Sequence, residues 1–190
     1  MERERQLRDP RELTAVAHPV RLGILEQLTL HGPLTATELA DRLDETPANC
    51  SWHLRKLAEH AFVEEAPREG GRRRPWQMSQ LGLSWGDEDA EPEEQRAGDA
   101  LAQMLLERWI SRYAASVAVD REAAPEWRRA RSVNQTVTWL TPTEAEEVHE
   151  HLRAVLERYR DRIEDASQRP EGSRMVELVT FGGPIDGVTR

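Results

Sequence analysis

The sequence contains almost no cysteine. Cys50 is the only one in 190 residues, which excludes an intrachain disulfide and a cysteine-rich metal cluster. Long apolar runs are also missing, and none approaches the length needed to span a bilayer. The first ten residues alternate in charge without an apolar stretch, so no signal peptide is expected. These absences predict a cytoplasmic protein without membrane partners.

Positive charge is scarce overall. The net charge is −9, and Lys56 is the only lysine among 26 basic residues. We interpret the arginine preference as a genomic base-composition bias, so it does not by itself indicate nucleic-acid binding. Residues 1–85 carry 12 basic and 13 acidic side chains, whereas residues 86–190 carry 14 and 22. Because local charge governs attraction to phosphate, the acidic total lowers the expectation of DNA binding without excluding it.

Signatures of catalysis are absent as well. The serines lack a paired histidine, and neither a glycine-rich phosphate loop nor a metal-hydrolase spacing occurs. His149 and His151 are two residues apart, so on a helix they point to different faces and do not form a chelate. The sequence therefore predicts no enzyme, no cofactor and no metal site. An enzyme is kept only as the alternative from a different class.

Apolar spacing and helix-capping residues predict four helices in the first half. Asp9, His18 and Thr46 each precede a proline, which is typical of a helix start, and Thr35 with Glu38 has capping-box spacing. The expected helices cover residues 10–17, 19–30, 35–43 and 46–60. Two short strands, 62–66 and 75–79, then flank a basic segment with two glycines. Together they predict a winged helix-turn-helix domain over residues 1–85.

The second half, residues 86–190, is expected to hold a dimerisation helix and an effector-binding α/β extension. Residues 86–94 are acidic and read as a linker. A long helix is expected over 93–119, a strand over 132–140, a helix over 144–165 started by a Thr143–Glu146 capping box, and a strand over 174–181. We expect the 144–165 helix to bury five apolar side chains: Val148, Leu152, Val155, Leu156 and Tyr159. The predicted fold class is mainly α, with α+β character.

The spacing of the third and fourth helices fits a helix-turn-helix, in which one helix is held by apolar contacts while its outer face enters the major groove. Ala40 is small where the two helices cross. Asp44 occupies the turn position that needs positive φ. Cys50, Leu54 and Leu57 are expected to be buried, with Cys50 a small hydrophobe rather than a redox sensor.

Several segments resemble the ArsR-type winged-helix repressors. They are Ala17–Leu25 (AHPVRLGIL), Glu38-Leu39-Ala40, Ser51–Leu57 (SWHLRKL) and the glycine-arginine wing, in this order. The chain departs from the family pattern at Asp44, usually glycine, and Glu45, usually apolar. The resemblance implies a homodimeric repressor that binds double-stranded DNA. The paired cysteines or helix histidines of the family's metal sensors are missing here, so a metal-independent member is expected.

The outward arc of the fourth helix supplies the candidate DNA contacts. Asn49 can pair with adenine and Arg55 with guanine or phosphate. Trp52 can pack on a thymine methyl or the sugar backbone, or its indole can lie on its own helix. His53 is expected to be structural and partly buried. The wing arginines can bind phosphate or enter the minor groove, or form a solvated hairpin. The candidate DNA-binding residues are Thr46, Asn49, Ser51, Trp52, Arg55, Lys56, Arg68, Arg72, Arg73 and Arg74.

The second half also contains most of the large aromatic residues. They can line a pocket for a small organic effector or simply fill a core. The candidate pocket residues are Met104, Trp109, Tyr113, Trp127 and Trp139. The sequence thus favours a DNA-binding transcriptional regulator, with a winged-helix protein-interaction module as the alternative.

Overall fold

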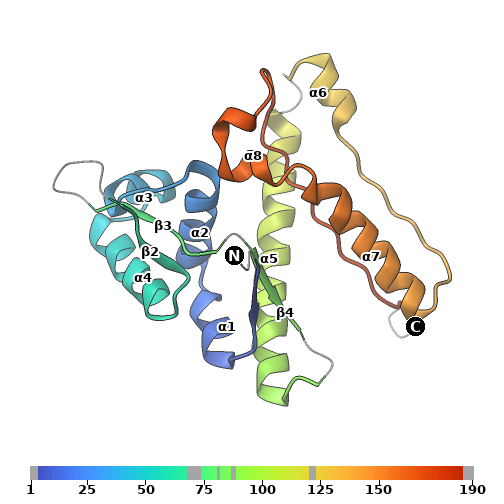
Figure 1. The fold of residues 1–190 in the computed structure, drawn as a ribbon, viewed down its shortest axis with the longest axis horizontal. Helices are drawn as coiled ribbons and strands as arrows, with labels where there is room; N and C mark the ends of the chain where they lie inside the picture. Colours follow the sequence, from blue (N-terminus) through green and yellow to red (C-terminus); the bar gives the residue numbers. More distant parts are fainter. Residues whose placement is uncertain (1–3, 68–73, 81, 87–88, 120–122, 186–190) are drawn as a thin grey trace. The chain divides into compact units, whose positions relative to one another are not determined.

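The fold is described from a computed structural model (Figure 1). It describes residues 4–67, 74–80, 82–86, 89–119 and 123–185. The chain divides into two compact units, Met1–Ser111 and Arg112–Arg190. The structure is mainly helical, as the sequence predicts, and it contains two small sheets. Within the described residues, no helix is both long enough and apolar enough to span a membrane.

The first unit contains four successive helices close to their predicted positions. Three of them start at a proline, and all four have a capping side chain that accepts a backbone N–H: Asp9, His18, Thr35 and Thr46. Thr35 and Glu38 form the predicted capping box. The helices are α1 (Pro10–Val16), α2 (Pro19–His31), α3 (Ala36–Leu43) and α4 (Pro47–Glu59).

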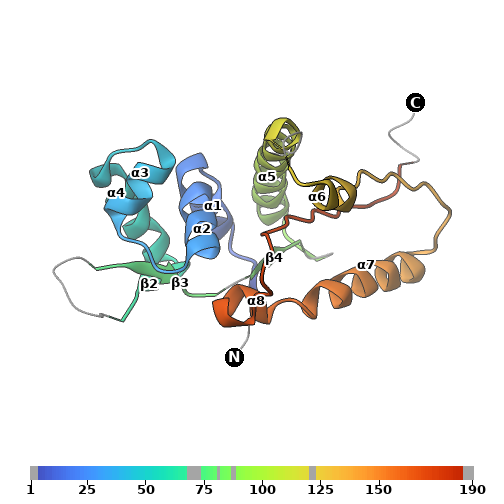
Figure 2. The same ribbon diagram turned by 90° about the horizontal axis from the view of Figure 1, so that it is seen from above.

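Two strands form the predicted wing beside α3 and α4 (Figure 2). Strand β2 (Val63–Glu65) pairs antiparallel with β3 (Trp76–Met78), with Val63 opposite Met78 and Glu65 opposite Trp76. A bridge between Leu34 and Trp76 ties the hairpin to the segment before α3. The four helices and this hairpin make residues 10–78 a winged helix-turn-helix.

A second sheet was not expected from the sequence. Strand β1 (Glu4–Leu7) pairs in parallel with β4 (Gly82–Trp85). Both strands are four residues long and lie about 75 positions apart, so neither carries a local signal that predicts the other. Leu7 is completely buried, and this pairing therefore ties the N-terminal segment to the core.

Helix α5 (Pro92–Val119) agrees with the predicted long helix, although it begins within the expected linker. Its first half packs on the core through Leu101, which is fully buried, and through the partly buried Met104 and Leu105. Arg108 binds Glu26 of α2 through two hydrogen bonds, 2.7 Å from Nε to Oε1 and 2.5 Å from Nη2 to Oε2. These contacts hold α5 against the helix-turn-helix.

The second unit differs most from the prediction. It contains α6 (Pro125–Ala130), α7 (Pro142–Glu157), α8 (Asp161–Glu164) and the 3₁₀ turn η2 (Ala166–Gln168). The expected strands 132–140 and 174–181 are wrong, because neither segment has a ladder partner among the described residues. Both segments contain valine, threonine and an aromatic residue, which favour strands, but a strand also needs hydrogen bonds from a neighbour. The expected helix 144–165 is interrupted after Glu157, and its capping box is Thr141–Glu144 rather than Thr143–Glu146.

The expected burial of the α7 apolar face is also wrong. Val148, Leu152, Val155, Leu156 and Tyr159 are all exposed. More generally, no side chain whose burial is described in residues 112–185 is buried. In its described residues, the second unit therefore has helices and extended segments with apolar side chains but no buried core.

Candidate nucleic-acid interface

The turn between α3 and α4 has the geometry that the sequence predicts. Asp44 adopts a left-handed conformation, with φ of 54° and ψ of 45°. Its N–H and that of Glu45 both donate to the Ala40 carbonyl, the latter at 3.0 Å, which satisfies the end of α3. Asparagine and aspartate tolerate this region better than most side chains, so Asp44 can replace glycine here.

Helix α4 begins immediately after this turn and is held by its buried face. The Thr46 hydroxyl accepts the Asn49 N–H at 3.2 Å, and Pro47 supplies the first helical residue. Cys50, Leu54 and Leu57 are fully buried, which confirms their predicted role. Burial raises the pKa of the Cys50 thiol, so this side chain stays protonated and acts as a small hydrophobe.

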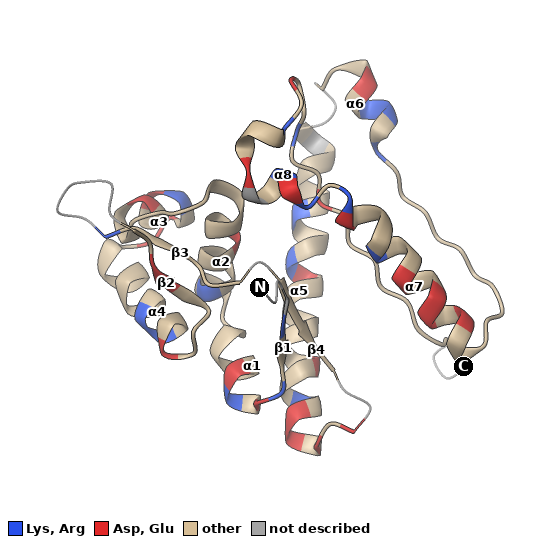
Figure 3. Ribbon diagram, in the orientation of Figure 1, with Lys and Arg blue, Asp and Glu red and all other residues tan. Residues whose placement is uncertain are grey.

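The polar side chains on the outward face of α4 differ in their exposure and in whether they are already paired. Asn49 Nδ2 donates to Glu45 Oε2 at 2.8 Å, and Lys56 Nζ pairs with Glu59 at 2.8 Å. Arg55 is exposed, and no acidic side chain among the described residues pairs with it. Ser51 is half-buried at the edge of this face. Arg55 is thus the basic group of α4 most available to an anionic partner. Figure 3 shows that α4 carries both basic and acidic positions.

Trp52 projects from the same helix and is 49% exposed. Its ring meets His53 edge-on, with 4.7 Å between ring centroids and an interplanar angle of 80°. One side of the indole therefore rests on its own helix while the rest stays accessible. This position is compatible with contact to DNA and equally with an indole lying on the helix surface, the two alternatives that the sequence leaves open.

The wing contributes one described arginine. Arg74 Nη1 donates to both carboxylate oxygens of Glu65, at 2.8 and 3.0 Å, so part of its charge is neutralised within the hairpin. The other predicted wing contacts, Arg68, Arg72 and Arg73, lie outside the described residues. Their role in phosphate binding stays a prediction.

The contact of the buried His53 with the half-buried His18 beneath α4 was not predicted from the sequence. His53 is 3% exposed, which confirms its structural position, and its ring centroid lies 4.5 Å from that of His18. His18 caps α2, its Nδ1 accepting the Val20 N–H at 3.2 Å. The His-Pro start of α2 and the position of His53 beside Leu54 were visible in the sequence, but their contact depends on how α2 packs on α4.

Burial controls the charge of this pair. It lowers the pKa of both histidines, and the nearby Arg21 guanidinium lowers them further, while Glu45 acts in the opposite direction. His53 Nδ1 and Arg21 Nε are buried without a hydrogen-bond partner within the described part of the chain. The two histidines are therefore neutral at pH 7. Their contact joins α4 to the start of α2 and adds no positive charge to the candidate interface.

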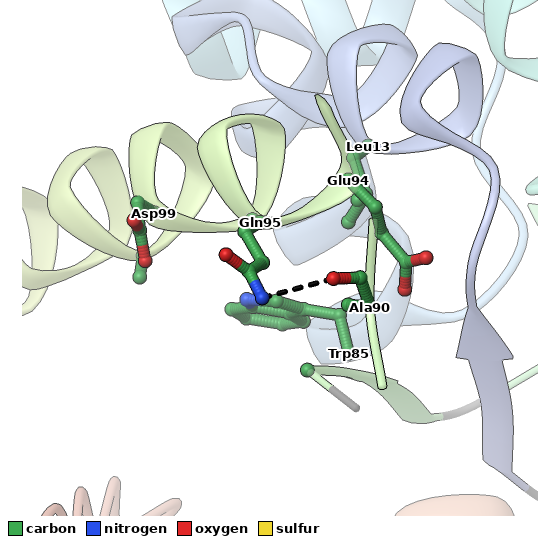
Figure 4. Close-up of a pocket in the computed structure, with 9 residues that line it drawn as sticks. Leu13, Trp85, Ala90, Glu94, Gln95 and Asp99 are labelled. Atoms are coloured by element: carbon green, nitrogen blue, oxygen red, sulfur yellow. Dashed lines mark hydrogen bonds between the residues drawn. The ribbon is translucent and has the colours of Figure 1, made fainter. Parts of the chain in front are cut away.

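A small cavity opens between α1, β4 and α5 in the first unit (Figure 4). Its volume is about 180 Å³, and its floor includes Trp85, beside which the Gln95 amide donates to the Ala90 carbonyl at 2.9 Å. Glu94 Oε1 is buried there without a partner among the described residues. The lining residues are Leu13, Trp85, Gly86, Ala90, Glu94, Gln95, Gly98, Asp99 and Ala102.

The five candidate effector residues do not line this cavity. In the first unit, Met104 packs partly buried against the core and Trp109 is half-buried. In the second unit, Tyr113 lies beneath the Arg131 guanidinium at 4.8 Å and Trp127 beneath that of Arg174 at 5.4 Å. Trp139 is 92% exposed. An effector site built from these residues stays a prediction.

Comparison with known proteins supports the domain assignment. A family model described as a helix-turn-helix domain matches residues 16–66, which span α2 to the wing's first strand. The class of protein is therefore a winged helix-turn-helix protein. No curated protein sequence matches the chain.

Solved structures of transcriptional regulators resemble parts of the chain. One is described as a "possible transcriptional regulator for arsenical resistance", with 26% identity over 53% of this chain and 94% of its own, and a TM-score of 0.32. A transcriptional regulator homologue from Pyrococcus horikoshii has 22% identity over 48% and 85%, with a TM-score of 0.33. A MarR family transcription regulator has 16% identity over 84% and 80%, with a TM-score of 0.33.

Proposed function

We propose that this chain is a sequence-specific, double-stranded DNA-binding transcriptional regulator of the ArsR type, acting in the cytoplasm as a homodimeric repressor. The observation that carries this proposal is the face of α4. It presents Asn49, Trp52 and Arg55 outward, Arg55 without an acidic partner among the described residues, while the apolar face is buried. A helix held in this way is the element that enters the major groove in helix-turn-helix proteins.

The net negative charge of the chain does not oppose DNA binding, because basic side chains are present on α4 and the wing, where the contact with DNA is proposed. Lys56 and Arg74 are each paired with a glutamate, so they would exchange these partners for phosphate on binding. Such exchange costs little, since ion pairs between exposed side chains are worth at most about 1 kcal/mol. Thr46 and Ser51 lie at the edges of the face, where side chains contact the backbone rather than the bases.

A dimer would use the N-terminal helix and α5, whose Ile110 remains 63% exposed. Two α4 helices about 34 Å apart would then read a pseudo-palindromic site. In this proposal residues 1–85 bind DNA, and residues 86–190 form the dimerisation helix and an extension that receives a small organic effector. No metal or cofactor is required.

The deciding experiment is capture and sequencing of genomic fragments on the purified full chain, followed by fluorescence anisotropy with the recovered site. Affinity should fall roughly 10³- to 10⁵-fold between 50 and 200 mM salt, because several phosphate contacts release counterions. Arg55→Ala should weaken binding to the recovered site by about 1–3 kcal/mol, whereas Arg96→Ala, at an exposed position of α5, should leave it unchanged. Weak, salt-insensitive binding by the intact chain would overturn DNA binding and favour the protein-interaction alternative.

A further inference from the structure

Arg21 is a half-buried arginine in the first turn of α2, beside the His18–His53 contact. Its Nε is buried and has no hydrogen-bond partner within the described part of the chain. Burial lowers the pKa of its guanidinium, and no carboxylate among the described residues opposes this effect. A desolvated cation without a partner is costly, so a group of this kind is expected to have an anion that binds it.

His53 supplies a second unsatisfied group at the same place. Its side chain is 3% exposed, and its Nδ1 also lacks a hydrogen-bond partner among the residues that the structure describes. The Arg21 guanidinium lies near enough to His53 and His18 to lower the pKa of both. Two neighbouring buried polar groups without partners, one of them a permanent cation, indicate a place where a ligand completes the hydrogen bonding.

The start of α2 favours a negatively charged ligand. The first turn of this helix contains no acidic residue, and the positive end of the helix dipole lies there. A cation such as Arg21 is unfavourable at this end of a helix, whereas an oxyanion is favourable. Among the described residues, Glu45 is the only carboxylate that acts on the histidines, and it is bonded to the Asn49 amide. The counter-ion for Arg21 must therefore come from outside the chain.

The position of these groups indicates which oxyanion can reach them. Residues 49, 53 and 56 are separated by four and three positions, so they follow one another along one side of α4. Asn49 and Lys56 are candidate DNA contacts, and His53 lies between them where α4 packs on α2 (Figure 1). Arg21 therefore lies at the flank of the proposed DNA-binding face. The sugar-phosphate backbone runs along this flank when a helix enters the major groove.

We propose that Arg21, with His18 and His53 behind it, forms an oxyanion site that binds one backbone phosphate of the DNA beside α4. The proposal rests on the proposed DNA-binding function and adds to it a phosphate contact from α2, outside the helix-turn-helix and the wing. Arg21 is not among the ten contacts expected from the sequence. Its guanidinium can donate two hydrogen bonds to one phosphate, which a lysine cannot match in geometry.

Arg21→Met tests the site, because stability and DNA binding should respond differently. Methionine removes the unpaired charge and keeps an apolar stem, so thermal unfolding of the free chain should be unchanged or shifted upward. Affinity for the recovered site should fall about 10- to 100-fold, as expected for lost hydrogen bonds to a charged group. Arg96→Met, at an exposed position of α5, is the matched control and should change neither. A variant that loses stability but keeps its affinity would show a structural role for Arg21 and overturn the proposal.

Neutral substitution in the DNA locates the phosphate. Each backbone phosphate of the recovered site is replaced in turn by a methylphosphonate. The wild-type chain should lose affinity at one phosphate beside the groove that α4 reads, and Arg21→Met should be indifferent to that same replacement. Its salt dependence should also fall by about one released counter-ion per half-site. If Arg21→Met remained sensitive to every phosphate that matters to the wild type, Arg21 would not be a phosphate contact.

A free oxyanion is the competing occupant of this site. In that case inorganic phosphate, added at constant ionic strength, would stabilise the wild-type chain but not Arg21→Met, and methylphosphonates would affect both proteins equally. This result would overturn the assignment to DNA. A wild-type chain that binds no DNA at any salt concentration would refute the proposed function together with this contact. Failure of the Arg21 contact alone leaves wild-type DNA binding intact, so the two failures are distinguishable.

Discussion

The side-chain amide of Asn49 is bound to the carboxylate of Glu45, with 2.8 Å between Nδ2 and Oε2, across the first turn of α4. This contact places an acidic group beside the amide that the proposal assigns to base reading. In the proposed complex, this contact would orient Asn49 before binding and would also bring a negative charge toward the DNA backbone. The two effects can be separated by substitution.

Glu45→Gln keeps a hydrogen-bond acceptor for Asn49 while removing the charge. We expect the affinity for the captured site to rise about two- to fivefold, since an exposed charge contact is worth about 0.2–1 kcal/mol. Fluorescence anisotropy at fixed salt measures the change. Glu93→Gln, exposed on α5, should have no effect. An unchanged or lower affinity for Glu45→Gln would contradict the placement of Glu45 near phosphate.

Asn49→Ala should remove a base contact rather than general attraction to DNA. We expect a loss of about 1–3 kcal/mol in binding and relaxed discrimination at a single base pair. Competition among operators that differ by one base pair measures both effects. The control is Asn134→Ala, exposed in the second unit. If all sites weakened by the same factor, Asn49 would be a backbone contact.

Substitutions at Asp44 test whether the positive φ of the turn between α3 and α4 affects stability. Asp44→Val should lower the free energy of unfolding by about 1–2 kcal/mol, because a β-branched side chain is strained at positive φ. Asp44→Gly should be neutral or slightly stabilising. Asp41→Val, at an exposed regular position of α3, should cost only a few tenths. Urea unfolding measures all three, and equal losses at positions 41 and 44 would argue against strain at the turn.

The Glu26–Arg108 pair should stabilise the packing of α5 on α2. The two side chains are only 22% and 29% exposed, and they share two hydrogen bonds. A double-mutant cycle with Glu26→Gln and Arg108→Met should give a coupling energy of about 1–3 kcal/mol. The same cycle on the exposed Lys56–Glu59 pair should give about 0.5 kcal/mol or less. Equal couplings would mean that α5 is held by apolar contacts alone.

The His18–His53 pair should make stability depend on pH. Burial lowers both pKa values in the folded protein, whereas the unfolded chain takes up protons near the ordinary value of 6.5. Their contribution is therefore complete above pH 6.5 and is lost as the pH falls through 6.5 toward the lowered folded values. Urea unfolding between pH 8 and 5 measures this loss.

His53→Gln should reduce this slope, because the substituted side chain does not titrate. His149→Gln, exposed on α7, serves as the control and should keep the wild-type slope. A variant at position 53 with an unchanged slope would show that the buried pair does not control the acid sensitivity.

The candidate interface was largely predictable because its signals are local. Thr35 with Glu38, Thr46 with Pro47 and the apolar spacing of Leu54 and Leu57 each act within a few residues. The sequence also indicated a buried His53 but not its contact with His18, which depends on the crossing of two helices. The pairing of Asn49 with Glu45 was missed, because Glu45 precedes the cap of α4 and lies outside the helical spacing that relates side chains on one face.

The second half shows the limit of this reasoning. Residues 132–140 and 174–181 have the composition of a strand, but a strand exists only where another backbone supplies hydrogen bonds. The apolar spacing of α7 likewise predicted that its side chains are buried, but it does not indicate which surface covers them. The β1–β4 pair shows the opposite. Neither segment has a sequence pattern that predicts a strand, yet the two form a sheet because the fold brings them together.

The sequence by itself thus determined the winged helix-turn-helix, its left-handed turn at Asp44 and the outward face of α4. These follow from capping, helical period and turn geometry, which act over a few residues. Only the tertiary structure decided the β1–β4 sheet, the His18–His53 contact, the Glu26–Arg108 bond and the exposure of α7. These features depend on contacts between segments that are far apart in the sequence, and a local pattern does not specify which distant segment will pack against it.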